Sequence, residues 1–247
     1  MLSPSTTTAF RPTPAILARK SYFGSPLVTE APKPASTARG VEQDPLARFG
    51  TISRYGKNST ICFEGDDVRY CFKVQSGTIR LCKTTEDGRR QIAAFLTAGD
   101  LFGWVDKEAY NFSAEAVTDV IVERFDRRRM DDAANTDPSL GSRILAVVSR
   151  QLESAQNHLV LLGRMTAPER VATFLLDLVK RQRAESSGGS IELAMNRRDL
   201  ADYLGLTVET VSRVMNSLKR NRVIAFSAPE NVRLTQGAAL KRLAMID

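Results

Sequence analysis

Hydrophobic and polar positions alternate in short runs between residues 46 and 136. Runs of Val, Ile, Phe and Leu are separated by turn signals that contain Gly65, Gly77, Gly88 and Gly99, at nearly even intervals. Several short strands with this spacing and these turns are typical of a β-sandwich or a β-barrel. The pattern therefore predicts that residues 46–136 form a first domain built from strands.

One hairpin of this domain can be predicted in more detail. Residues 78–83 alternate between apolar and polar side chains, and Asp87-Gly88 separates them from a second apolar run at 91–95. Asp-Gly favours the two positive φ angles of a type I′ turn. We therefore expect two antiparallel strands joined by a tight turn at this dipeptide.

The hydrophobic period changes after Asp137-Pro138-Ser139, which is a helix start signal. Apolar residues then recur at steps of three and four, which indicates one long helix over residues 137–163. This helix either packs only on its own β-domain or pairs with a second copy of the chain, and its long stripe with polar flanks favours pairing. The residues predicted to form this dimer interface are Leu140, Ile144, Val148, Leu152, Ala155, Leu159 and Leu162.

Residues 164–247 have the pattern of a second, helical domain. A capping box at Thr166–Glu169 opens a helix. The Ser-Ser-Gly-Gly-Ser segment at 186–190 is expected to be a loop. The apolar stripe of the helix falls on Val171, Phe174, Leu175 and Leu178.

The segment 196–224 contains two short helices joined by a tight turn. Asn196 caps the first helix, Gly205 supplies the left-handed residue that ends it, and Thr207 caps the second. Residues 221–226 and 231–234 then predict a hairpin wing. The predicted inward-facing residues are Leu200, Ala201, Leu204, Val211, Val214, Met215 and Leu218. This arrangement is a helix-turn-helix.

The polar face of the second helix indicates what the domain binds. One side of this helix carries Glu209, Ser212 and Arg213, which project together. A glutamate can accept from the cytosine N4 donor, an arginine can donate to guanine O6/N7, and a serine can pair with a donor or an acceptor on a base. We assign these three residues to base readout. Residues assigned to the DNA backbone are Arg197, Arg198, Thr207, Thr210, Asn216 and Lys219. The alternative is an ordinary solvated helix face, but the turn, the caps and both helix faces agree on a DNA reader.

Charge supports a polyanionic partner. The chain of 247 residues carries 35 Lys and Arg against 28 Asp and Glu, a net charge of +7. Composition alone leaves nucleic acid and anionic membranes open as partners. No apolar run approaches the length of a membrane span, so we expect a soluble protein that does not enter a membrane. The basic run Arg127–Arg129 is interpreted as a solvated face rather than a contact with DNA or polymerase.

Cysteine and histidine are too sparse for common metal or catalytic sites. Cys62, Cys71 and Cys82 include no CxxC pair, so neither a disulfide framework nor a zinc site is expected, and a reducing compartment such as the cytoplasm fits. We expect buried thiols in strands, and we expect His158 in a polar seam or at the surface rather than on haem. No catalytic residues and no metal site are predicted, because no carboxylate pair, nucleophile–base set or phosphate loop is present.

Residues 1–45 do not have the pattern of a folded domain. They are rich in Ser, Thr and Pro, and no acidic residue precedes Glu30. This composition predicts a disordered arm, with an organelle transit peptide as the alternative. The apolar region of a secretory signal is missing.

The motif Asp199–Arg213 resembles the winged helix of the CRP/FNR transcription regulators, and the similarity extends from the β-domain to the wing. Gly99-Asp-Leu-Phe-Gly103 is similar to a turn of the family's β-roll, and Glu209-Thr-Val-Ser-Arg213 has the Glu-x-x-Ser-Arg form of the FNR branch. Residues 87–92 and 158–163 are most similar to the FixK group. The resemblance implies an α+β fold with an N-terminal cupin-like double-stranded β-roll, a long dimerisation helix and a C-terminal winged helix-turn-helix.

The resemblance also implies a function. Proteins of this kind are homodimers that bind a palindrome of the TTGAT-N4-ATCAA type, contact RNA polymerase and control genes for low-oxygen respiration, denitrification or nitrogen fixation. The hairpin aligns with a polymerase-contacting region of FNR-type activators. The candidate polymerase contacts are therefore Thr85, Glu86, Asp87 and Arg89.

Departures from the family pattern bear on its ligands. Trp104 follows the roll's Gly99–Gly103 turn where cyclic-nucleotide sensors have Glu, and Phe112-Ser113 stands where an Arg-Ser pair grips the cyclic phosphate. No cysteine precedes Cys62, so the cluster ligands of oxygen sensors are missing. We therefore expect no cofactor. The alternative is a ligand-gated sensor for haem, nitric oxide or a small organic effector, and the third class, an enzyme with a nucleic-acid tether, has no supporting motif.

Overall fold

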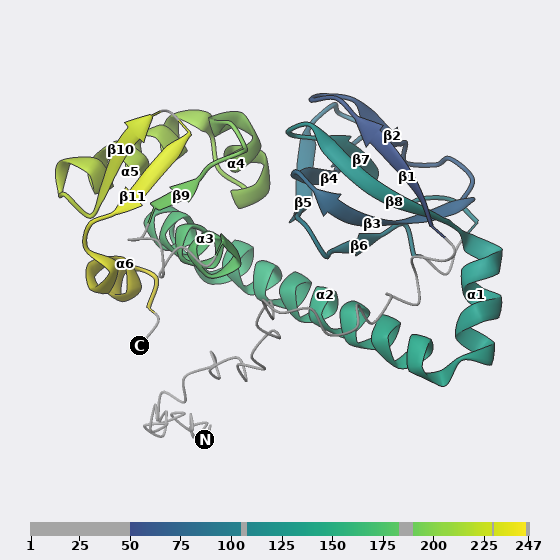
Figure 1. The fold of residues 1–247 in the computed structure, drawn as a ribbon. Helices are drawn as coiled ribbons and strands as arrows, with labels where there is room; N and C mark the ends of the chain where they lie inside the picture. Colours follow the sequence, from purple (N-terminus) through teal and green to yellow (C-terminus); the bar gives the residue numbers. More distant parts are fainter. Residues whose placement is uncertain (1–49, 105–107, 183–189, 229, 246–247) are drawn as a thin grey trace, which may run out of the picture. The chain divides into compact units, whose positions relative to one another are not determined.

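The computed structural model describes residues 50–104, 108–182, 190–228 and 230–245, and the following description concerns these residues (Figure 1). The arm predicted for residues 1–45 and residues 186–189 of the predicted loop lie outside them.

Two antiparallel sheets of four strands each form the β-roll. The first sheet has the strand order β1 (Gly50–Tyr55), β8 (Val120–Asp126), β3 (Tyr70–Ser76) and β6 (Leu101–Phe102). The second has the order β2 (Thr60–Cys62), β7 (Ser113–Ala116), β4 (Ile79–Thr84) and β5 (Arg90–Leu96). Alternate residues of both sheets, including Val74, Ile79, Ala114 and Val122, are completely buried between them. The predicted β-domain is confirmed, and its period of two places one face of every strand in this core.

The β4–β5 hairpin is present, but its turn differs from the expected type I′. Thr84 pairs with Arg90, and Gly88 donates its backbone N–H to the carbonyl oxygen of Thr85 at 2.8 Å. Gly88 has a φ of 81°, whereas Asp87 does not have the positive φ that a type I′ turn requires. The connection matches a longer loop that ends in a glycine bulge, and the type I′ prediction is wrong.

A helix that the sequence analysis did not predict follows the last strand of the roll. Helix α1 (Arg127–Thr136) begins at the basic run and is capped by Asp126, which accepts a hydrogen bond from the backbone N–H of Arg129 at 3.1 Å. Only Met130 and Ala133 of this helix are buried. Its hydrophobic period is therefore too sparse to be recognised from the sequence.

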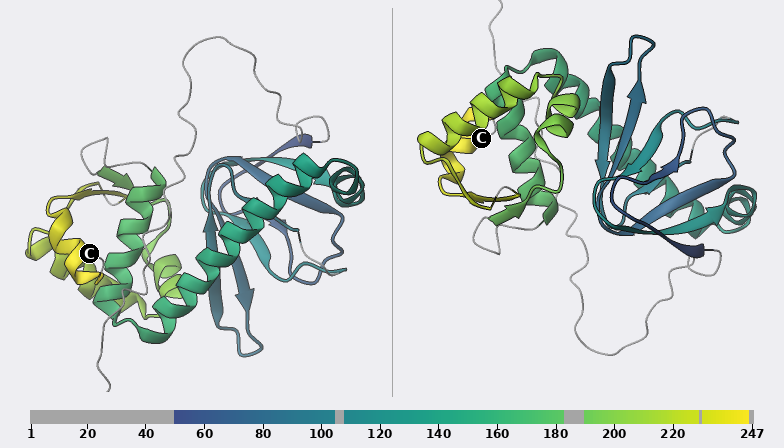
Figure 2. Two further views of the ribbon diagram at one scale, coloured as in Figure 1. Left: turned by 90° about the horizontal axis from the view of Figure 1, so that it is seen from below. Right: turned by 90° about the horizontal axis from the view of Figure 1, so that it is seen from above.

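Helix α2 (Pro138–Arg164) is the predicted long helix, and Figure 2 shows it passing along the β-roll. Asp137 caps it by accepting from the backbone N–H of Ser139 at 2.9 Å. Leu140 and Ile144 are buried with Phe125 and the neighbouring face of α1. Because the protomer itself covers these two residues, they offer no surface to a second chain, and the predicted interface has to be corrected at this end.

The exposed apolar stripe of α2 begins at Leu145, five residues after the predicted start at Leu140. Leu145, Val148, Leu152 and Leu159 are between 41% and 68% exposed, and Ala155 is exposed between them. These positions follow steps of three and four, as in a coiled-coil seam. Leu162 is partly buried against the core of the second domain. The geometry therefore adds Leu145 to the stripe that is predicted to form a dimer interface.

The C-terminal domain combines four helices with a small sheet. Its elements are α3 (Ala167–Gln182), β9 (Ser190–Glu192), α4 (Arg197–Leu204), α5 (Val208–Arg220), β10 (Ile224–Ala228), β11 (Asn231–Leu234) and α6 (Gly237–Leu243). The strands pair in the order β10-β11-β9. The predicted stripe of α3 and the wing hairpin are confirmed, while Ser190, assigned to a loop, begins the unpredicted strand β9. Together the two domains confirm the α+β fold.

Candidate nucleic-acid interface

Three residues at the helix ends shape the helix-turn-helix as predicted. The side-chain oxygen of Asn196 accepts from the backbone N–H of Asp199 at 2.9 Å, and the hydroxyl of Thr207 accepts from that of Thr210 at 3.2 Å. Gly205 ends α4 with φ 61° and ψ 42°, the left-handed conformation in which glycine is least strained. Each cap satisfies a backbone donor that would otherwise have no helical partner, at a value of about 1 kcal/mol.

Buried apolar side chains fix α4 against α5. Leu200, Leu204, Val211 and Met215 are at most 2% exposed and belong to one core. Because these residues occupy the inner faces of both helices, the polar face of α5 is left on the outside.

Arg170 ties this unit to the end of α2, a role that the sequence did not reveal. Its Nη1 donates to the carbonyl oxygen of Leu204 at 2.8 Å, its Nη2 to that of Leu162 at 2.8 Å, and its Nε to that of Met165 at 2.9 Å. The carbonyl groups at a helix end lack helical partners, so one guanidinium satisfies several of them. No motif marks this arginine, because its partners are backbone atoms from two other segments.

The predicted base-reading residues share one surface of α5. Glu209 and Arg213 are exposed and Ser212 is partly exposed, and the exposed Asn216, assigned to the DNA backbone, lies on the same side. Arg213 donates from Nη2 to the hydroxyl oxygen of Thr210 at 3.2 Å. The pKa of Glu209 lies below its usual value because its carboxylate accepts from its own backbone N–H, with further help from Thr207 and Arg213. The surface therefore presents an ionised acceptor one turn from a guanidinium donor.

Val208 lies beside Glu209 and is 36% exposed. It is not among the residues predicted to contact DNA, although an apolar residue outside the buried stripe of such a helix is a signal that the sequence does contain. An apolar side chain at such a place suits contact with the methyl group of thymine.

The candidate backbone contacts divide into two groups. Arg198, Thr207 and Lys219 are exposed. Arg197 is partly buried, with its guanidinium 5.4 Å from the ring centroid of Phe226 on the wing, and Lys219 Nζ lies 5.8 Å from the same ring. Arg197 therefore packs against the wing, whereas Arg198 is directed to solvent. Of the two remaining candidates, Asn216 is exposed on α5 and Thr210 is partly buried at the start of that helix.

The polymerase-contact candidates form one exposed turn. Thr85, Glu86, Asp87 and Arg89 are all exposed. Asp87 accepts from the Thr85 hydroxyl at 2.5 Å and from Arg89 Nε at 2.7 Å, and these hydrogen bonds hold the pKa of its carboxyl group below the usual value. The loop is therefore an ordered, charged projection of the β-roll.

The positions that grip a cyclic nucleotide in related sensors have other roles here. Trp104 packs at the edge of the α1–α2 core, with the guanidinium of Arg127 5.8 Å from its ring centroid. The hydroxyl of Ser113 accepts from the backbone N–H of Glu64 at 2.9 Å. Lys83 Nζ lies 5.9 Å from the ring centroid of Phe112. Phe112 therefore stands where the sensors have the arginine that grips the cyclic phosphate.

The three thiols are buried, and the histidine is partly buried with both ring nitrogens shielded from solvent. Burial raises the pKa of Cys62 and of Cys82 to about 11 and that of Cys71 to about 12, so all three thiols are protonated at neutral pH. The prediction of buried thiols in strands is confirmed. His158 stacks on Tyr203 of α4 with ring centroids 4.1 Å apart, which corrects the expected surface or seam position. Burial, followed by the charge of Arg170, lowers its pKa. Within the described residues, no group of three or more His, Cys, Asp or Glu side chains is placed to hold a metal ion.

Comparison with known proteins agrees with this architecture. Residues 169–243 match the Crp-like helix-turn-helix domain, and residues 52–137 match the cyclic nucleotide-binding domain. The nitrogen fixation regulation protein FixK of Azorhizobium caulinodans is 42% identical over 215 residues, which cover 83% of this chain and 87% of the relative. The chain belongs to the CRP/FNR family of transcription regulators, in its FixK-like group.

Other members of the family extend this result. The FixK protein of Rhizobium meliloti is 35% identical over 81% of this chain and 90% of its own length. The structure of FixK2 from Bradyrhizobium japonicum superposes with a TM-score of 0.74 at 38% identity, over 78% of this chain and 96% of that one. The family assignment makes α5 the recognition helix of a DNA-binding regulator. In the described part of the chain, no helix is both long enough and apolar enough to cross a membrane.

Proposed function

We propose that the protein is a homodimeric transcription activator of the FixK type that reads a TTGAT-N4-ATCAA palindrome. The observation that carries the proposal is the exposed row of Glu209, Ser212 and Arg213 on the recognition helix. The G·C pair of each half-site offers guanine O6/N7 to Arg213 and cytosine N4 to Glu209. Val208, next in line, suits a thymine methyl group in the same half-site.

The remaining surfaces have separate tasks in this proposal. Arg198, Thr207 and Lys219 contact phosphate and fix the register on the duplex, which supports readout without specifying bases. The exposed turn at residues 85–89 contacts RNA polymerase. The regulated genes serve low-oxygen respiration, denitrification or nitrogen fixation, and the protein acts in the cytoplasm without a required effector.

The dimer part of the proposal rests on the exposed stripe of α2. Five apolar positions from Leu145 to Leu159 follow heptad steps over more than three helical turns. Two recognition helices must be about 34 Å apart to enter successive turns of the major groove, and pairing of the two α2 helices is the means we propose for this spacing.

Sedimentation and operator binding test both halves of the proposal. Replacing Leu152 and Leu159 with Asp places charges in the seam, and we expect monomers that no longer retain operator DNA. Ser154→Asp with Asn157→Asp adds the same charge at exposed positions away from the stripe, and this control should remain a dimer. A dimeric Leu152→Asp/Leu159→Asp variant would place the interface elsewhere, and wild-type protein that ignores the palindrome would refute the assigned operator.

A ligand-gated regulator is the second candidate, and one cavity favours it. The cavity has a volume of about 310 Å³ and lies between β3, the 99–101 segment and α2. Its lining includes Lys73, Arg143 and Arg150, which suit an anionic molecule. An absorbance spectrum and mass spectrometry of the purified protein would reveal haem or a retained effector. Operator binding by protein free of any such ligand would favour the first candidate.

A further inference from the structure

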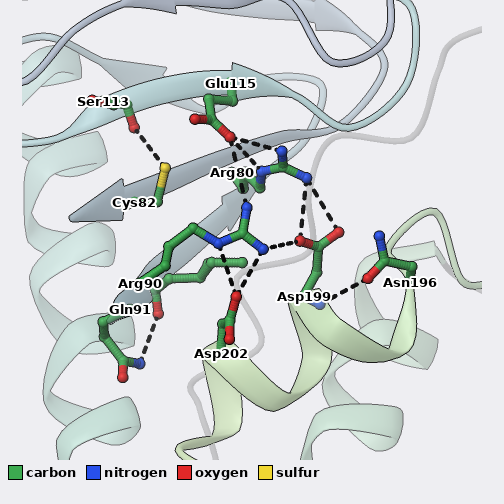
Figure 3. Close-up of polar contacts among 10 residues, drawn as sticks. Arg80, Cys82, Arg90, Gln91, Ser113, Glu115, Asn196, Asp199 and Asp202 are labelled. Atoms are coloured by element: carbon green, nitrogen blue, oxygen red, sulfur yellow. Dashed lines mark hydrogen bonds and ion pairs between the residues drawn. The ribbon is translucent and has the colours of Figure 1, made fainter. Parts of the chain in front are cut away.

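Five charged side chains meet where α4 lies against the β-roll (Figure 3). Asp199, whose side chain is 1% exposed, accepts from Arg80 Nη1 at 3.2 Å and from Arg90 Nη2 at 2.7 Å. Asp202 accepts from Arg90 Nε at 2.8 Å, and Glu115 on β7 accepts from Arg80 Nε at 2.7 Å. We refer to these five residues as the roll–helix clamp. It joins side chains that are more than one hundred positions apart in the sequence.

The clamp fixes the orientation of α4 relative to the β-roll. Glu115 holds Arg80 from within the β-roll, so the guanidinium reaches α4 already oriented, and its Nη1 lies 3.2 Å from both carboxylate oxygens of Asp199. Charge-assisted hydrogen bonds of this kind add geometric specificity as well as energy. Desolvation offsets much of the Coulomb energy of buried ion pairs, so their most evident effect is on which arrangement is adopted.

An aromatic cluster holds the same helix on its apolar side. The ring of Tyr203 lies 5.2 Å from that of Phe95 on β5, 5.8 Å from that of Phe174 on α3 and 4.1 Å from that of His158 on α2. Helix α4 is thus fixed to the β-roll and to the long helix at once. Because α5 shares its core with α4 and follows after three residues, the orientation of α4 also sets that of the recognition helix.

The reading surface remains open while the clamp is closed. Glu209, Arg213 and Asn216 are exposed in the clamped arrangement, and Arg198 at the start of α4 is exposed as well. Asp199 and Asp202 lie on the face of α4 that turns toward the roll, so the clamp does not compete with DNA for the assigned contacts. The closed clamp is therefore compatible with binding.

We propose that the roll–helix clamp positions the recognition helix for the operator, with Arg90 and Asp202 as positioning residues. In a dimer, the clamp on each protomer then sets the distance and angle between the two recognition helices. The quantity it controls is the preference for half-site spacing, since each half-site is read by α5 itself. This inference rests on the proposed dimer and palindrome.

Charge exchange in the full-length dimer tests the proposal. Arg90→Glu opposes Asp199, Asp202 and Glu115, whereas Arg90→Glu combined with Asp202→Arg restores two cations and three anions to the clamp. Asp202→Asn is a milder variant that removes one charge without reversing it. Arg69→Glu is the matched charge control, because Arg69 is exposed and forms an ion pair with the exposed Asp67 at 3.5 Å, outside the clamp.

The readout is fluorescence anisotropy on operators with the assigned spacer and with spacers one base pair shorter or longer. We expect Arg90→Glu to weaken binding to the assigned spacer by roughly 5- to 150-fold, with a smaller loss on the other two, so that spacing preference shrinks. Discrimination at the G·C pair within a half-site should stay unchanged. The double variant should recover most of both the affinity and the spacing preference, Asp202→Asn should lose less than Arg90→Glu, and Arg69→Glu should behave as wild type.

Three results would overturn the positioning role. They are unchanged binding by Arg90→Glu on all spacers, an equal loss on all spacers that the double variant does not restore, and tighter binding by Arg90→Glu. The last would mean that the clamp holds the recognition helix away from DNA. Wild-type protein that fails to bind the palindrome would refute the proposed function instead, before any variant is compared.

Discussion

The two helices of the helix-turn-helix both carry a charged face, but only one of these faces is open to solvent. On α5, Glu209 and Arg213 are exposed and contact mainly residues of their own helix. On α4, Asp199 is buried and Asp202 is largely covered, because the β4–β5 hairpin supplies Arg80 and Arg90. A charged helix face is therefore free for a partner only where no complementary side chain of the same chain reaches it.

This difference separates stability from recognition. Side chains in a buried ion-pair network are coupled to folding, since removing one leaves others desolvated and underpaired. Exposed charges contribute little to folding, because water already solvates them. Substitutions at Asp199 and Asp202 of α4 should therefore affect the folded state first, and substitutions at Glu209 and Arg213 of α5 should affect the choice of DNA first.

The largest effect on stability is expected at Asp199. Asp199→Ala should lower the free energy of unfolding by about 2 to 3 kcal/mol. This loss is smaller than that for a buried charge left with no partner, because the two arginines of the clamp remain paired with Glu115 and Asp202. Urea unfolding of the intact protein measures this loss. The matched substitution on the other helix, Glu209→Ala, should stay within about 0.5 kcal/mol of wild type. Equal losses for the two variants would contradict the contrast between the helices.

Base readout should be the most sensitive property of α5. Arg213→Ala should cost roughly 1 to 3 kcal/mol of operator affinity and relax discrimination mainly at the G·C pair, because in the proposed readout the guanidinium bonds to one guanine. Binding to a series of single-base operator variants measures both the loss of affinity and the change in discrimination. Uniform loss of affinity with full discrimination at that pair would show that Arg213 contacts backbone instead.

Phosphate contacts should act on all sequences alike. Arg198→Ala should weaken binding to every operator variant to the same degree and lower the slope of log affinity against log salt by about one unit. Arg197 is a useful comparison, since its guanidinium packs on Phe226 and its loss should also loosen the wing. A change in base preference on Arg198→Ala would move that residue into the readout group.

Local signals predicted most of the fold and the reading surface. The caps at Asn196 and Thr207 and the glycine at 205 depend on a few neighbouring residues, so the sequence contains the whole of each interaction. The recognition face follows from the helical period in the same way. These are the features in which sequence and structure agree.

Features that depend on distant partners could not be predicted this way. Leu140 and Ile144 belong to the same apolar stripe as the exposed seam, but α1, which is too polar to recognise, covers them. The aspartates of α4 have the pattern of solvated charges until Arg80 and Arg90 are brought to them by the fold of the roll. Sequence periodicity predicts which residues share a face of a helix, whereas the tertiary fold determines whether that face is covered by another segment or exposed to solvent.

The smallest effect is expected from pH, and it again distinguishes the two helices. The pKa of Glu209 is lowered, so its carboxylate remains ionised below the usual range of glutamate, and its contribution is lost only as the pH falls through that lowered value. The one histidine, His158, lies on the apolar side of α4, away from the reading surface, and its pKa is lowered as well. Discrimination at the G·C pair should therefore be constant from about pH 8 to about pH 5.

Glu209→Gln keeps the shape of the side chain but adds a hydrogen-bond donor, so it should lose part of this discrimination equally at every pH. Anisotropy titrations of both proteins over this range measure the ratio of affinities for the G·C operator and its variant. A step in the wild-type ratio within this range would mean that protonation of His158, and hence the packing of α4, controls what α5 reads.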